Sequence, residues 1–285
     1  MKETSITEST RGMIKKHDFK IAKKFGQNFL VDENILKTII DCSELSKDDC
    51  VLEIGPGLGA MTKELCEKAG RVLAVEIDKK LIPILKVSLF DYENFKLINE
   101  DILKLNLKAT LEENFGSSPI KVVANLPYYI TTPILMKLLE EDINIKSIAI
   151  MVQKEVGERL CAAPGGKDYG ALTVAVQYRC IPHKILIVPP ESFIPKPEVE
   201  SMVVRLDSRD KPPVVLKDEK MYFRVVKASF GQRRKTLLNA LTAGNLGRTK
   251  EELKTVLIKN GIDEVRRGET LSLEEFARIA NELSQ

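Results

Sequence analysis

The chain has 285 residues, of which 44% are hydrophobic and 30% are charged, and its net charge is +3. Domains usually contain about 100–200 residues, so this length predicts one large domain and one small one. No apolar run approaches the roughly 18 residues that span a bilayer, and the first ten residues lack the apolar stretch of a secretory signal. We therefore expect a soluble, cytoplasmic protein that makes no membrane contact.

The cysteines and histidines indicate a reducing compartment and offer few metal ligands. The five cysteines are widely spaced and form no Cys-x-x-Cys pair, so we interpret them as reduced core residues. Only His17 and His183 are present, which leaves little for a zinc cluster or a histidine-centred triad. We expect no metal, and chemistry that relies on positioning.

The N-terminal part of the chain is predicted to be a flexible basic extension over residues 1–22, with a disordered polar tail over residues 1–10. Six Lys or Arg residues accompany a single acid between Arg11 and Lys24. After it comes Phe25-Gly26-Gln27-Asn28-Phe29-Leu30, which either forms a shaped loop or acts as a hydrophobic staple for the next helix. Both interpretations stay open. Asp32 is the expected N-cap of that helix.

A buried-strand pattern over residues 50–54 runs into Gly55-Pro56-Gly57-Leu58-Gly59-Ala60, and a helix follows. Glycines let the backbone approach a cofactor closely, and the helix N-terminus offers free amides. The next strand, over residues 71–77, places Glu76 where a carboxylate can bind both hydroxyls of a ribose. A nucleoside cofactor is therefore predicted. Because the glycine pattern also fits the dinucleotide fingerprint, NAD remains an alternative.

Two further strands bring polar residues to the same edge of the predicted sheet. Residues 96–99 lead to Asp101, whose carboxylate could accept a hydrogen bond from an adenine amine. Residues 121–124 lead to Asn125-Leu126-Pro127-Tyr128. Strands separated by helices predict a doubly wound parallel sheet with helices on both faces and ligands at the carboxyl ends of the strands.

The Asn125–Tyr128 segment suits a planar aminated base. The exocyclic amine of adenine is a poor nucleophile because its lone pair is delocalised into the ring, so a site must orient it and accept its N–H protons. Asn125 Oδ1 and the Leu126 carbonyl could do so, and the ring of Tyr128 could stack on the base, a contact worth about 1–3 kcal/mol. Taken alone, the same residues are also typical of an ordinary strand-to-helix turn.

The middle of the chain is predicted to continue with a helix over 134–140, a strand over 147–152, helices to residue 160 and over 171–178, and a strand pair over 184–188 and 202–206. Between the last two strands, a proline-rich loop could hold Phe193 rigidly outward, so that Phe193 and Tyr128 sandwich a base. The alternative is that Phe193 is buried under the loop.

Residues 208–213 are interpreted as a linker to a small helical domain. Two capping boxes, Thr249-x-x-Glu252 and Ser272-x-x-Glu275, mark helix starts there. Eight Lys or Arg residues and no acid lie between Lys220 and Lys250. A single run of this kind is usually a solvated helix face, but together with the basic run near the other end it leaves nucleic acid binding and a solvated face about equally open. The domain prediction is an extension over 1–22, a large domain over 23–207 and a helical RNA-binding domain over 214–285. The candidate RNA contacts are Lys23, Lys24, Arg233, Arg234 and Lys235.

The assembled motifs resemble one family, the small-subunit (16S) rRNA adenine dimethyltransferases, which are the kasugamycin-sensitivity methyltransferases of bacteria. The resemblance covers the chain from about Lys23 onward. Its motifs are Gly26-Gln27-Asn28-Phe29-Leu30, Glu53-Ile54-Gly55-Pro56-Gly57-Leu58-Gly59, Asn125-Leu126-Pro127-Tyr128, Glu191-Ser192-Phe193-x-Pro195-x-Pro197-x-Val199-x-Ser201 and Phe230-x-x-Arg233-Arg234-Lys235-x-Leu237.

The resemblance implies a Rossmann-like methyltransferase sheet with a small helical C-terminal domain and S-adenosylmethionine as methyl donor, which leaves as S-adenosylhomocysteine. It implies four methyl transfers, two to N6 of each of two adjacent adenines in the 3′-terminal hairpin loop of 16S rRNA, within an immature small subunit. We expect a monomer. The catalytic candidates are Asn125, Leu126, Tyr128 and Phe193. The cofactor-binding candidates are Asn28, Leu30, Gly55, Gly57, Glu76, Ile77, Asp101, Ile102 and Asn125.

Three other functions remain open. A related enzyme could methylate large-subunit rRNA and confer macrolide resistance with a similar Asn-x-Pro-aromatic site. An NAD-dependent dehydrogenase would explain Glu76 and the glycine loop, but it leaves the Asn125–Tyr128 segment and both basic ends without a role. A mainly non-catalytic assembly factor for the small subunit would be compatible with the same sequence.

Overall fold

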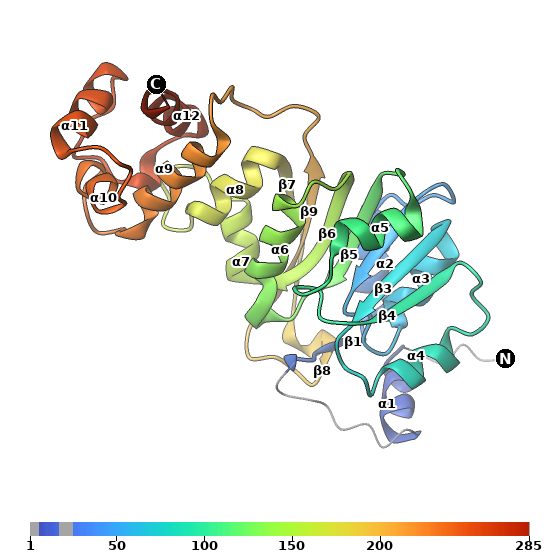
Figure 1. Ribbon diagram of the computed structural model, residues 1–285. Coiled ribbons are helices and arrows are strands. Elements are labelled where there is room, and N and C mark those ends of the chain that lie inside the picture. Colours follow the sequence, from blue (N-terminus) through green and yellow to red (C-terminus); the bar gives the residue numbers. More distant parts are fainter. Residues whose placement is uncertain (1–5, 17–24, 285) are drawn as a thin grey trace. The chain divides into compact units, whose positions relative to one another are not determined.

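The computed structural model describes residues 6–16 and 25–284, and its chain divides into two compact units (Figure 1). Unit 1 contains the chain up to Gly157 together with His183–Ser208. Unit 2 contains Glu158–Pro182 together with Arg209 and all that follows. Within the described ranges, no helix combines the length and the apolar character that crossing a membrane requires.

Unit 1 is built on a seven-stranded sheet whose strand order is β4-β3-β2-β5-β6-β9-β7. The strands from β4 to β6 run parallel, and β9 is antiparallel to β6. The interior strands are predominantly apolar, with Glu53 in β2 and Lys121 in β5 as exceptions, as is typical of parallel strands covered on both faces. The bounds are Cys50–Ile54 (β2), Arg71–Glu76 (β3), Phe95–Asn99 (β4), Ile120–Asn125 (β5), Ile145–Gln153 (β6), Cys180–Val188 (β7) and Ser201–Ser208 (β9).

Helices cover both faces of this sheet (Figure 1). On one face, α2 and α3 pack through Ile39 and Leu65 against Val51, Val123 and Ala149 of the central strands. Helices α5 and α6 lie on the opposite face in Figure 1. The bounds are Glu33–Cys42 (α2), Ala60–Lys68 (α3), Ile82–Ser88 (α4), Leu107–Phe115 (α5), Thr131–Glu140 (α6) and Lys154–Leu160 (α7). The predicted doubly wound architecture is confirmed, and the expected Asp32 N-cap accepts from the amides of Asn34 and Ile35.

The order of the strands determines where a ligand can bind. From β2 the chain adds β3 and β4 on one side, and it then returns to place β5 and β6 on the other side. The carboxyl ends of β2 and β5 are neighbours, with Ile54 opposite Ala124. Because helices leave these two strand ends in opposite directions, a crevice opens there.

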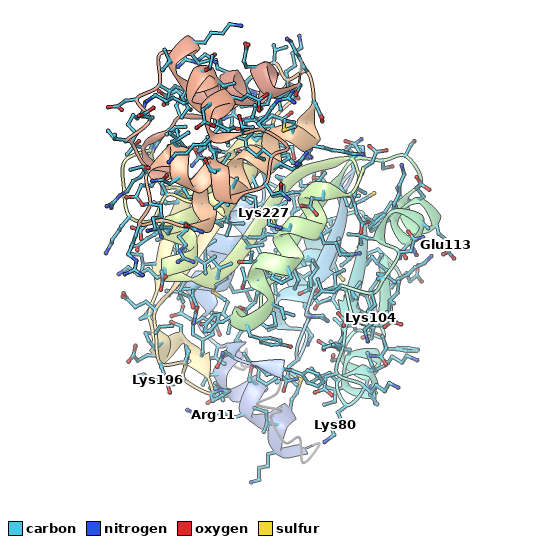
Figure 2. All side chains as sticks on the ribbon, turned by 60° about the vertical axis from the view of Figure 1, so that its left-hand side comes forward. Arg11, Lys80, Lys104, Glu113, Lys196 and Lys227 are labelled. Carbon is cyan, nitrogen blue, oxygen red and sulfur yellow. The ribbon has the colours of Figure 1, made fainter. Side chains whose placement is uncertain are left out.

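The N-terminal residues differ from their prediction. Residues 6–16 form helix α1 (Ile6–Lys16) rather than a disordered tail, and Ile6, Met13 and Ile14 pack against the cores of unit 1. The backbone amide of Ile6 donates to Glu33 Oε1 at 2.9 Å, and Thr7 Oγ1 donates to the Val31 carbonyl at 3.0 Å. The sequence prediction weighed only the polar composition and overlooked apolar residues at helical spacing. Charged residues of α1 such as Arg11 remain exposed at the surface (Figure 2).

Unit 2 is helical, and its core gathers large side chains, among them Tyr169, Tyr178, Tyr222 and Phe276. Both predicted capping boxes are present. The boundary of unit 2 differs from the predicted one. Residues 158–182, which were predicted to belong to the large domain, group with the C-terminal helices. The physical reason is packing, since the rings of Tyr178 and Tyr222 lie 5.3 Å apart. The bounds are Ala171–Arg179 (α8), Glu219–Gly231 (α9), Leu237–Ala243 (α10), Lys250–Lys259 (α11) and Leu273–Leu283 (α12).

Candidate active site

A cavity opens in unit 1 at the carboxyl ends of β2, β3 and β5, and it encloses about 1140 Å³ including its open mouth. Every predicted cofactor-binding residue lies in its wall, as do three of the four catalytic candidates. The sequence thus identified residues that the fold brings together from strand ends far apart in the chain. The predicted residues in the wall are Asn28, Leu30, Gly55, Gly57, Glu76, Ile77, Asp101, Ile102, Asn125, Leu126 and Tyr128.

The glycine loop presents backbone rather than side chains to this cavity. Gly55 has a φ of +73°, and a Cβ added there would meet nothing nearer than the Asn125 carbonyl oxygen at 3.9 Å. At Gly57, where φ is +59°, an added Cβ would come within 3.1 Å of the Phe29 ring. Only glycine adopts this backbone easily, and Gly55 leaves open space where a ligand can approach the chain closely.

The carboxylate of Glu76 is held at the end of β3. Its side chain is 4% exposed; Oε1 accepts from the Asp78 amide at 2.7 Å, and Oε2 accepts from the Gly57 amide at 3.3 Å. Burial raises the pKa of Glu76 to about 7, although the two backbone donors oppose the shift. The group is thus an acceptor of fixed orientation in the cavity wall.

A second buried carboxyl, Glu53, was not predicted as a site residue. It is fully buried in β2, and neither of its oxygens has a hydrogen-bond partner in the part of the chain that the structure describes. Thr62 lies beside it without reaching hydrogen-bonding geometry. Burial, with a smaller contribution from Glu76, raises the pKa of Glu53 to about 8. An acidic residue inside the apolar run Cys50–Ile54 was the signal in the sequence.

Replacing Glu53 with glutamine should flatten the pH dependence of stability. The folded-state pKa of Glu53 lies above its ordinary value, so its contribution to stability is complete below about pH 4.5 and is lost as the pH rises through about 8. The melting temperature of the ligand-free wild type should therefore fall between about pH 4.5 and about pH 8, and that of Glu53→Gln should fall less. Calorimetry across this pH range measures the slope of the melting temperature for each protein, with Glu113→Gln, a change at an exposed position, as control. Equal slopes would contradict it.

Asn125 is oriented by a bond to a distant loop. Its Nδ2 donates to the Asn28 carbonyl at 3.0 Å, and this bond fixes the amide so that Oδ1 is the remaining acceptor. The following turn is fixed as well, since the Leu126 amide donates to the Met151 carbonyl at 3.1 Å and Thr131 Oγ1 donates to the Pro127 carbonyl at 3.1 Å. Within the described part of the chain, the Leu126 carbonyl accepts no hydrogen bond. Two acceptors are therefore available side by side in the chain.

Tyr128 is held by its hydroxyl. It shares a 2.6 Å hydrogen bond with Ser201 Oγ, and Ser201 is fully buried in β9. Burial raises the pKa of Tyr128, so the phenol is neutral at physiological pH. The ring is thereby fixed in the cavity wall.

Phe193 does not lie where the outward prediction placed it. It is 3% exposed and belongs to β8 (Phe193–Ile194), which pairs with β1 (Phe29–Leu30) so that Phe193 stands opposite Leu30. The side chain packs in the core with Val188 and Val203 and does not line the cavity. The two-stranded sheet of β1 and β8, which was not predicted from the sequence, turns the ring of Phe193 inward. The alternative of a phenylalanine buried under its loop is the observed one.

The structure describes three of the five candidate RNA contacts. Lys23 and Lys24 lie outside the described residues. Arg233, in unit 2, donates to the Lys167 carbonyl and forms a 3.3 Å ion pair with Glu269. Arg234 and Lys235 are exposed.

No group of three or more His, Cys, Asp or Glu side chains in residues 6–16 and 25–284 is arranged to hold a metal ion. The expectation of chemistry without a metal stays a prediction. The site instead offers oriented acceptors, a buried acid and open backbone, which together suit a nucleoside and an aminated base.

Comparison with known proteins gives one consistent family. The sequence model of a family described as "Ribosomal RNA adenine dimethylase" matches residues 18–285. "Ribosomal RNA small subunit methyltransferase A" from Alkaliphilus oremlandii is 53% identical over 285 residues, which cover 100% of this chain and 99% of that protein. The protein of the same name from Clostridioides difficile is 48% identical over 282 residues, covering 99% and 97%.

Solved structures agree with these relatives. A dimethyladenosine transferase from Plasmodium falciparum is 25% identical with a TM-score of 0.75, over 88% of this chain and 95% of that one. The 23S rRNA methyltransferase ErmE is 26% identical with a TM-score of 0.69, over 90% and 100%. The fold is therefore shared by an enzyme named for dimethyladenosine transfer and by one named for 23S rRNA methylation.

Proposed function

The chain belongs to the ribosomal RNA adenine dimethylase family, and from this membership we propose that it methylates N6 of two adjacent adenines in the 3′-terminal hairpin loop of 16S rRNA, each adenine twice. The donor is S-adenosylmethionine, and the substrate is rRNA within an immature small subunit. The observation that carries this proposal is the pair of acceptors, Asn125 Oδ1 and the Leu126 carbonyl, at the edge of a cavity suited to a nucleoside.

The residues of the cavity fit S-adenosylmethionine. Gly55 leaves its backbone open to the cavity, and Glu76 places a buried carboxylate at the strand end from which both ribose hydroxyls can be bound. Asp101, in the same wall, suits the adenine amine of the donor. An NAD-dependent dehydrogenase would use the same glycine loop, but the family membership removes that alternative.

The acceptor half of the site orients an amine. Asn125 Oδ1 and the Leu126 carbonyl accept the two N–H protons of the extruded adenine, and Tyr128 stacks on its face. Because Asn28 and Ser201 fix Asn125 and Tyr128, this orientation is built before the substrate arrives. Most of the acceleration then comes from proximity and orientation.

When bound, the donor supplies an electrophilic methyl group on a sulfonium, and it leaves as a neutral thioether. Asn125 and Leu126 hold the exocyclic nitrogen N6 of the adenine while N6 forms the new bond to the methyl carbon. The methylated nitrogen is acidic, so its proton passes to solvent without a dedicated base. No covalent intermediate with the protein forms.

The experiment that tests this function offers radiolabelled S-adenosylmethionine with naked 16S rRNA, immature small subunits and large subunits, and then maps the labelled adenines. We expect label on two adjacent adenines of the small-subunit rRNA. Label on large-subunit rRNA alone would overturn the proposal in favour of the activity after which ErmE is named.

We propose Arg234 and Lys235 as phosphate contacts, because both are exposed in an acid-free stretch of unit 2. Replacing both with alanine should weaken binding to small-subunit rRNA and reduce the slope of log K against log salt by about two. Filter binding across salt concentrations measures both quantities. Lys259→Ala, which removes an exposed lysine paired with Glu282, is the control. An unchanged slope would exclude these two residues.

A role in assembly of the small subunit is compatible with catalysis and forms part of the same proposal. A variant without transferase activity that still binds immature subunits would separate the two roles. A monomer and a cytoplasmic location stay predictions.

A further inference from the structure

The segment from Gly26 to Val31 contacts both halves of the site, although only two of its residues, Asn28 and Leu30, were predicted to bind the cofactor. Phe29 packs against the glycine loop, and Leu30 pairs with Phe193. The Val31 amide donates to the Ser192 carbonyl at 2.8 Å. Its residues Phe29–Leu30 form strand β1, and the choice between a shaped loop and a hydrophobic staple stays a prediction.

The residues assigned to S-adenosylmethionine form the donor half of the site, and the segment acts on them through Gln27. Gln27 Nε2 donates to Asp78 Oδ2 at 2.8 Å. Asp78 is 4% exposed, and its own amide donates to Glu76 Oε1 at 2.7 Å. Glu76 in turn accepts from the Gly57 amide at 3.3 Å. Gln27 is therefore linked to the carboxylate assigned to the ribose through Asp78, whose side chain accepts from Gln27 and whose backbone amide donates to Glu76.

Toward the acceptor half, the segment acts through the next residue. The carbonyl of Asn28 accepts the 3.0 Å hydrogen bond from Asn125 Nδ2. This bond decides which end of the Asn125 amide faces the adenine. Gln27 and Asn28 are consecutive residues, so a displacement of Gln27 is passed along the backbone, through Asn28, toward the carbonyl that orients Asn125.

We propose that Gln27 is a positioning residue for methyl transfer, which through Asp78 holds Glu76 for the donor and through Asn28 holds Asn125 for the acceptor. The inference rests on the proposed function, since it takes Glu76 as the ribose ligand and Asn125 as the amine ligand. Gln27 touches neither reacting atom. Its effect on binding and on rate passes through the two residues that it positions.

The Gln27–Asp78 pair can be reversed, and this gives a sharp test. Asp78 Oδ1 accepts from the Lys80 amide at 3.1 Å, while Oδ2 accepts from Gln27. In the double variant Gln27→Glu/Asp78→Asn, Asn at 78 keeps an oxygen for Lys80 and donates its amide to Glu at 27. Gln27→Glu alone sets two carboxylates against each other. Asp78→Asn alone can keep the pair, because the Gln27 amide can rotate so that its oxygen accepts from Asn at 78.

Gln27→Glu should raise the dissociation constant of S-adenosylmethionine at least about tenfold and lower kcat at saturating donor, whereas Asp78→Asn should change both quantities less. The double variant should restore both to within about threefold of the wild type. Titration calorimetry measures donor binding without RNA, and labelled methyl transfer to immature small subunits measures kcat. Gln27→Met removes the donor group without adding charge, so it covers the case in which Gln27→Glu fails to fold.

Asp91→Asn makes the same chemical change at an exposed position and should alter neither quantity. Gln27 variants that lower only the melting temperature, or a double variant that remains as impaired as Gln27→Glu alone while folded, would overturn the inference. Failure of the proposed function is distinguishable, because the wild type would then transfer no methyl group to small-subunit rRNA.

Discussion

Replacing Asn125 with alanine should reduce methyl transfer to small-subunit rRNA by at least about 10²–10³-fold, to the level of background in most assays. The substitution removes Oδ1, the acceptor that fixes the amine, and it also frees the Asn28 carbonyl. Binding of S-adenosylmethionine should stay within a few fold, because Glu76 and the glycine loop are unchanged. Labelled transfer and titration calorimetry on the same preparation measure the two effects.

Asn114→Ala is the matched control. Asn114 also donates its Nδ2 to a backbone carbonyl, that of Thr110 at 2.8 Å, but it lies outside the cavity. This variant should retain wild-type activity. An active Asn125→Ala enzyme would remove the assigned acceptor role, whereas loss of donor binding together with activity would place Asn125 mainly in the donor half.

Replacing Glu76 with alanine should weaken binding of S-adenosylmethionine at least about 100-fold at pH 8, above the Glu76 pKa of about 7, since two hydrogen bonds to a charged acceptor contribute about 1.5–3 kcal/mol each. S-adenosylhomocysteine carries the same ribose, so its affinity should fall by the same factor. Calorimetry with both ligands provides the comparison. Glu113→Ala, an exposed change on α5 (Figure 2), should affect neither.

The comparison of the two ligands also tests the cause. A loss confined to S-adenosylmethionine would mean that Glu76 acts on the positive charge of the sulfonium and not on the ribose hydroxyls. In that case the buried Glu53, whose pKa is influenced by Glu76, would also act on the charge of the sulfonium.

The parts of the fold and site that were predicted depend on local pattern. Strands rich in apolar residues, helices with caps such as Asp32, and a glycine loop after a buried strand are all encoded within a few residues. The rule that parallel strands present ligands at their carboxyl ends then brought Glu76, Asp101 and Asn125 to one edge. The structure gathers these three residues in one cavity wall.

The features that were missed depend on contacts between distant segments. The pairing of Leu30 with Phe193 joins residues far apart in the chain, and two-residue strands have no periodicity to detect. The burial of Phe193 follows from that pairing, so the proline-rich loop alone could not decide it. The bond from Gln27 to Asp78 is of the same kind. Helix α1 was missed for another reason. Its apolar residues occur at helical spacing, but the prediction considered only the polar composition of the segment.

The discontinuity of unit 2 has a consequence for any attempt to isolate it. Its core takes Tyr169, Val174 and Tyr178 from a segment that precedes β7, whereas its remaining helices follow β9. A fragment beginning at Arg209 would leave the fully buried ring of Tyr222 without its neighbour Tyr178. A stable version would need residues 158–182 grafted onto residues 209–285. In evolutionary exchange, this helical region would accordingly move as two pieces and not as one cassette.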